Sequence, residues 1–106
     1  MIHHCVWIRF RTDINQQTRD VLLQEIADLV GVIPGLQAVH RGRNARFEDL
    51  DHGFEDGFIA VFDNRTALQA YQDHPAHQAT GKRLVESAQG GLQGLLVFDL
   101  VTEMSA

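Results

Sequence analysis

Two strand-helix-strand units follow one another in this chain, and that order of elements restricts the folds open to it. Side chains alternate in character over residues 2–10, as in a strand with two different faces. Apolar residues then recur at helical spacing from Val21 to Ile33, behind capping side chains at 12–15. Pro34-Gly35 ends this predicted helix, and residues 36–42 form a short second strand.

The second half of the chain follows the same plan. A polar loop at 43–53 precedes a third strand at 54–62, and residues 63–64 offer a cap for a second helix. Pro75 suits the first turn of a further helical segment, and residues 92–102 form the fourth strand. Two split βαβ units predict an α+β, ferredoxin-like (βαββαβ) protomer whose helices cover one face of an antiparallel sheet.

Both faces of the predicted sheet are apolar. One face carries Val6, Ile8, Phe58, Ala60 and Val97, and the opposite face carries Trp7, Ile59, Val61, Leu96, Phe98 and Leu100. Two helices cover one face only, and monomers rarely leave a contiguous apolar patch in water. The pattern therefore predicts a homodimer that forms through the second sheet face.

Length, charge and cysteine content exclude several classes of protein. The 106 residues are expected to form one domain, 1–106, and the net charge of −5 with scattered basic residues argues against a nucleic-acid or anionic-membrane partner. Cys5 stands alone, so no internal disulfide forms. No signal peptide and no stretch of about 20 apolar residues is present, which predicts a cytoplasmic protein.

The segment from Tyr71 to His77 holds the main concentration of reactive side chains. Tyr71, His74 and His77 follow helical spacing near the end of the second helix. In one interpretation Tyr71 belongs to the core with its hydroxyl in water, and the histidines cap the C-terminal end of the helix, where an imidazolium is favoured. In the other, His77 is a general base and Tyr71 hydrogen-bonds a carbonyl oxygen on which charge develops.

Two further polar residues lie on strands that are otherwise apolar. His4 shares a face with Val6 and Ile8, and Asp56 belongs with the apolar face of the third strand. The first and third strands of a ferredoxin-like sheet are neighbours, so we expect Asp56 to pair with His4 and to orient its ring. Asp99 also falls on an apolar face. The alternative for Asp56 is a solvated position near its strand end.

A metal site is a competing interpretation of the histidine cluster. His74 and His77 with one carboxylate could bind a divalent ion. However, His-Pro-x-His lacks the i, i+4 display of helical zinc motifs, and one cysteine cannot complete a thiolate site. We therefore expect neither a metal nor any other cofactor.

Segments along nearly the whole chain resemble the stress-responsive A/B barrel (Dabb) family. They are His4-Cys-Val-Trp-Ile-Arg-Phe10, Val32-Ile-Pro-Gly-Leu36, Gly42-Arg-Asn44, Phe62-Asp-Asn-Arg-Thr-Ala-Leu68, Tyr71-Gln-Asp-His-Pro-Ala-His77 and Leu95-Leu-Val-Phe-Asp99. The resemblance implies a dimeric α+β barrel built from ferredoxin-like protomers. It also implies that Tyr71 and His77 match the catalytic pair of a plant polyketide cyclase that needs no cofactor.

The resemblance further implies a pocket between sheet and helices, with His4, Phe58 and His74 near it. The third strand departs from the plant cyclase, which has a pocket histidine where this chain has Asp56, and this changes the charge of the pocket. We expect His4, Asp56, Phe58, His74 and Val97 to be substrate-binding residues. We expect a small apolar carbonyl compound as ligand, and proton transfer, isomerisation or aldol-type cyclisation as the reaction. The first alternative is a non-catalytic stress or ligand-binding protein of the same fold. The second is a cofactor-free oxygenase, which Trp7 and an apolar pocket would permit.

Overall fold

The computed structural model describes residues 1–102, and its elements follow the predicted order. Asn15 and Asn64 cap the first two helices, each accepting a hydrogen bond from a backbone amide of the first turn. A short 3₁₀ turn replaces the start of the predicted fourth strand. The elements are β1 (Ile2–Ile8), α1 (Gln16–Ala27), β2 (Leu36–Arg43), β3 (Asp56–Phe62), α2 (Arg65–Asp73), α3 (Pro75–Ser87), η1 (Gly91–Gly94) and β4 (Leu95–Val101).

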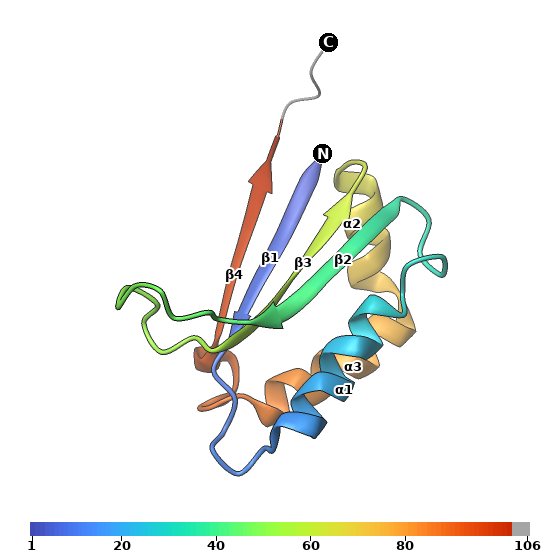
Figure 1. The fold of residues 1–106 in the computed structure, drawn as a ribbon. Helices are drawn as coiled ribbons and strands as arrows, with labels where there is room; N and C mark the ends of the chain where they lie inside the picture. Colours follow the sequence, from blue (N-terminus) through green and yellow to red (C-terminus); the bar gives the residue numbers. More distant parts are fainter. Residues whose placement is uncertain (103–106) are drawn as a thin grey trace.

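The four strands form one antiparallel sheet in the order β2-β3-β1-β4. Figure 1 shows the three α-helices on one side of this sheet, with β4 at the edge farthest from β2. The prediction of an α+β, ferredoxin-like protomer is confirmed. No helix within residues 1–102 has the length and apolar character to cross a membrane.

The register of β1 assigns the side chains of the sheet to its two faces. His4 lies opposite Ala60 of β3 on one side and Asp99 of β4 on the other, and Val6 lies opposite Phe58 and Val97. Since facing residues share a side of the sheet, these side chains all belong to the helix-covered face. The predicted division of apolar residues between the two faces is confirmed.

The first helix is shorter than its apolar pattern predicts. It ends at Ala27, and turns occupy the chain from there to β2. Gly31 and Gly35 adopt positive φ values of 87° and 85°, a left-handed conformation that suits glycine and cannot continue a helix. Ile33 is nevertheless buried in the core. Its apolar character therefore reflects burial of a turn and not a helical face.

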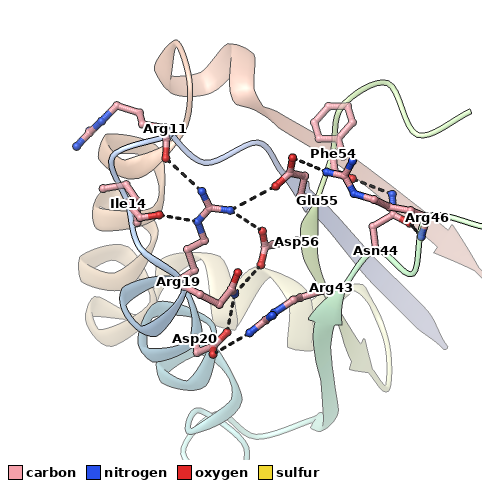
Figure 2. A network of polar contacts seen from close by, with 11 residues as sticks. Arg11, Ile14, Arg19, Asp20, Arg43, Asn44, Arg46, Phe54, Glu55 and Asp56 are labelled. Carbon is pink, nitrogen blue, oxygen red and sulfur yellow. Dashed lines mark hydrogen bonds and ion pairs between the residues drawn. The ribbon is translucent and has the colours of Figure 1, made fainter. Parts of the chain in front are cut away.

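A buried ionic network joins the start of α1 to the start of β3, and it includes Asp56. Arg19 donates to Asp56 at 3.3 Å and to the carbonyl oxygen of Ile14 at 2.8 Å (Figure 2). Gln16 donates to the other oxygen of Asp56 at 3.3 Å. The Asp56 side chain is only 1% exposed, so these partners offset the cost of burying its charge.

The expected pairing of Asp56 with His4 is wrong. The two strands are neighbours, as predicted, but their register places Asp56 opposite Ile8, four residues from His4. Asp56 instead holds α1 against the sheet through Arg19.

The sheet face opposite the helices is open, and the loop 44–55 extends beside it (Figure 1). A pocket of about 630 Å³ lies between this loop and open-face residues that include Trp7, Ile59 and Leu96. Leu96, Phe98 and Leu100 of the same face are each about half exposed. The loop adds the exposed side chains of Phe47 and Leu50 to this apolar surface.

Candidate functional site

Tyr71 is fully buried between α2 and the sheet. It lies on the same stripe of α2 as Ala67 and Leu68, the other two buried residues of that helix. Its ring packs edge-on against Phe62, with centroids 5.0 Å apart, and against His4, with centroids 5.8 Å apart. The buried face of α2 thus brings the Tyr71 ring into contact with His4 of β1.

The helix that carries Tyr71 is interrupted at His74, and this interruption positions His77. The Nδ1 atom of His74 accepts a hydrogen bond from the backbone amide of Ala76 at 3.1 Å, which caps α3, and Pro75 occupies its first position. On one continuous helix, side chains six residues apart would point in directions about 120° apart and lie roughly 9 Å apart along the axis. Two separate helices allow His77 to turn back towards Tyr71.

The rings of Tyr71 and His77 lie against each other. Their centroids are 3.8 Å apart and their planes are inclined by 34°. The Tyr71 hydroxyl and the His77 Nδ1 atom are both buried, and neither has a hydrogen-bond partner among residues 1–102. An unpaired buried donor or acceptor costs about 1–3 kcal/mol, so two of them on stacked rings mark a site that is suited to a polar ligand.

Burial determines the protonation state of both residues. It lowers the pKa of His77, and the nearby His4 and His74 add to this effect while the Gln72 backbone opposes it. Burial also raises the pKa of Tyr71. At neutral pH His77 is therefore a neutral ring that can accept a proton, and Tyr71 keeps the proton with which it can donate a hydrogen bond.

Asp99 is the carboxylate that orients His4. Asp99 lies on the edge strand β4, and one of its oxygens is 2.6 Å from the Nδ1 atom of His4 on the neighbouring strand β1. Because an ionised carboxylate only accepts hydrogen bonds, it holds the proton on Nδ1 and leaves Nε2 as the second polar atom of the ring. The alternation of residues in β4 predicts that Asp99 lies on an apolar face, but it does not identify a partner for this carboxylate. The position of β4 next to β1 was the missing information.

The other predicted site residues lie at different places around this group. Phe58 is buried, with its ring centroid 6.4 Å from that of His4. Val97 is half exposed on β4, and His74 is the helix cap described above. Asp56 lies at the far end of β3 in its pair with Arg19. The structure thus brings together His4, Phe58, Tyr71 and His77, and it separates Asp56 from them.

Two pockets adjoin the sheet. A small pocket of about 230 Å³ lies next to the His4-Asp99 pair, and it is lined by Ile2, Arg65, Leu68, Gln69, Gln72, Asp99 and Val101. The larger pocket lies beside the loop 44–55 and contains Asp56 and Phe58 in its lining. Tyr71 and His77 line neither of them, so the expected apolar pocket around this pair stays a prediction.

The competing metal site finds few candidate ligands. Within residues 1–102, no group of three His, Cys, Asp or Glu side chains is arranged to hold a metal ion. The Nδ1 atom of His74 is engaged in capping α3. The described residues therefore supply no ligand set that includes His74 and His77 together with a carboxylate.

Comparison with known proteins adds a family and a set of similar folds. The model of the family described as "Stress responsive A/B Barrel Domain" matches residues 2–102. The stress-response A/B barrel domain-containing protein HS1 of Arabidopsis thaliana is 29% identical over 101 residues, which cover 92% of this chain and 86% of that protein.

Solved structures show the same fold. A dimeric ferredoxin-like protein of unknown function from Jannaschia sp. CCS1 has a TM-score of 0.83 and 32% identity, covering 95% of this chain and 98% of its own. A hydroxynitrile lyase from Passiflora edulis has a TM-score of 0.83 at 15% identity, covering 99% of this chain and 95% of its own. The second likeness shows the fold alone.

The lowered pKa of His77 predicts an acid-sensitive fold. The unfolded chain binds the His77 proton more readily than the folded protein, so stability is complete above pH 6.5 and decreases as the pH falls through that value. We expect urea unfolding at pH 8, 7, 6 and 5 to show a smaller loss of free energy for His77→Gln than for the wild type. His52→Asn, which removes an exposed histidine, is the control and should follow the wild type. Equal pH slopes for His77→Gln and wild type would contradict the assigned direction.

Proposed function

The chain belongs to the stress-responsive A/B barrel domain family, and from this premise we propose that it binds a small carbonyl compound and catalyses proton transfer next to the carbonyl group. The observation that carries the proposal is the stacked pair Tyr71 and His77, each with a buried polar atom that makes no hydrogen bond of good geometry within residues 1–102. The Tyr71 hydroxyl can donate a hydrogen bond to an oxygen of the ligand, and the His77 imidazole can accept a proton.

The proposed reaction starts with removal of a proton from the carbon beside the carbonyl. His77 takes this proton, the C–H electron pair forms a C=C bond, and the carbonyl π electrons move to oxygen. The Tyr71 hydroxyl donates a hydrogen bond to that oxygen and stabilises its developing charge. His4, oriented by Asp99, lies next to the Tyr71 ring and adds a polar group at the same place.

The fate of the enolate decides which reaction results. Return of the proton to the same carbon gives hydrogen exchange, and its delivery to another carbon gives isomerisation. Attack of the enolate on a second carbonyl carbon forms a C–C bond, which is an aldol-type cyclisation when both carbonyls belong to one molecule. The hydroxynitrile lyase among the structural neighbours supports the view that this fold can carry an enzyme.

We also propose that the protein is a homodimer that forms through its open sheet face. Leu96, Phe98 and Leu100 expose about half of their surfaces there, and Trp7 and Ile59 lie on the same face. At roughly 25 cal/mol per Å², a patch of several hundred Å² supplies on the order of 10 kcal/mol before the costs of association. The Jannaschia protein with the same fold is described as dimeric.

The proposed chemistry predicts hydrogen exchange that depends on the pair. With 2-hexanone in D₂O, the protein should exchange the protons beside the carbonyl for deuterium, followed by loss of their NMR signals. His77→Ala and Tyr71→Phe should each lower the rate by roughly 100-fold or more, typical of losing a general base or an oxyanion donor. His52→Asn should keep the wild-type rate. If both variants stay folded and exchange as fast as the wild type, the catalytic assignment is wrong, and a non-catalytic binding protein is the better interpretation.

The dimer proposal predicts a charge-sensitive interface. Ile59→Glu would bury an unpaired carboxylate between two sheets, so the variant should be monomeric or unfolded. Val21→Glu is the matched control, because Val21 is exposed on α1, on the other side of the sheet, and this variant should remain dimeric. Light scattering at micromolar concentration measures the mass. A monomer mass for the wild-type protein would contradict the proposal.

A further inference from the structure

The small pocket between α2 and the β1-β4 edge contains three polar side chains of α2 that the proposed reaction does not use, Arg65, Gln69 and Gln72. Its apolar walls come from Ile2, Leu68 and Val101, and its volume of about 230 Å³ suits a ligand smaller than a drug-sized molecule. Asp99 forms part of its lining and also binds His4, whose ring packs against Tyr71. The pocket therefore borders on the proposed reaction site.

Arg65 is the cation of this pocket. It lies exposed at the first position of α2, and it has no acidic, amide or carbonyl partner within residues 1–102. The remaining arginines of the chain all have one. Their partners are Gln93 for Arg9, Asp13 for Arg11, Asp56 for Arg19, Gln24 for Arg41, Asp20 for Arg43, Glu55 for Arg46 and Glu25 for Arg83.

The polar residues of α2 that line the pocket form a row along the helix. Arg65, Gln69 and Gln72 are separated by four and three residues, which places them on one face. The row extends over about 10 Å, with Arg65 at one end and Gln72, the neighbour of Tyr71, at the other. A ligand in this pocket would contact Arg65 and lie beside Asp99, which binds His4; Tyr71 and His77 do not line the pocket.

From this arrangement we propose that the ligand carries a carboxylate that Arg65 binds, several bonds away from its reacting carbonyl. The ligand class is an oxo acid with a short apolar chain, which the walls of the pocket would contact. A guanidinium matches the two oxygens of a carboxylate in a bidentate pair. One cation suits a monoanion, and Asp99, which also lines the pocket, pairs with His4 at 2.6 Å and not with Arg65. This inference rests on the proposed function for the role of the carbonyl.

The test compares a charged ketone with its uncharged ester. Amide NMR shifts of α2 would be followed while 5-oxohexanoate, methyl 5-oxohexanoate or hexanoate is added to the full-length protein at pH 7.5. The wild type should bind the acid at least about 5-fold more tightly than the ester, and Arg65→Gln should abolish this preference. Lys82→Gln removes an exposed cation from α3, outside the pocket, and should keep it. Added salt should weaken binding of the acid more than binding of the ester.

The outcomes separate this inference from the proposed function. If the acid and the ester bind equally, or if Arg65→Gln still prefers the acid, the proposal that Arg65 binds a carboxylate is wrong. In that case, exchange of 2-hexanone that still depends on His77 would leave the proposed function intact. If hexanoate and 5-oxohexanoate both bind through Arg65 but His77→Ala does not change proton exchange in 5-oxohexanoate, the anion site stands and the carbonyl chemistry is wrong.

Discussion

The register of the central strand β1 is the constraint on which the candidate site depends. It places His4 on the helix-covered face, opposite Asp99 and with its ring packed edge-on against the ring of Tyr71. A slip of one residue would turn His4 to the open face and would remove Val6 and Ile8 from the core at the same time. The apolar face that stabilises the sheet therefore also fixes the orientation of the imidazole.

A second constraint acts on the helix side of the sheet. His74 ends α2 and caps α3, so the break at this residue separates the helix that carries the buried Tyr71 from the helix that returns His77 towards it. His74 thus has a clear structural task, whatever its part in binding. The alternative interpretation, a core tyrosine with its hydroxyl in water and histidines that cap the end of the helix, holds for the packing of the Tyr71 ring. However, the hydroxyl is buried, and the His74 side chain caps the start of α3. That interpretation does not account for the unpaired hydroxyl of Tyr71 or the unpaired Nδ1 of His77.

The sequence predicts those features that depend on local patterns. Alternation gives the strands and their faces, and Asn64 and Pro75 mark helix starts that the structure confirms. Periodicity fails at Ile33, because burial in a turn and burial on a helix leave the same apolar signal. It also cannot tell which carboxylate meets His4. Asp56 and Asp99 have equivalent local patterns, and only the pairing of β1 with both of its neighbours selects Asp99.

The central claim is that Tyr71 and His77 act together on one carbonyl group, and a double-mutant cycle on the exchange rate tests it most directly. The four proteins are the wild type, Tyr71→Phe, His77→Ala and the double variant, each checked for folding. If the two residues act as a unit, the exchange rate of the double variant should be only a little lower than that of the slower single variant. A double variant whose loss equals the product of the two single losses would contradict the account, because the two residues would then act independently.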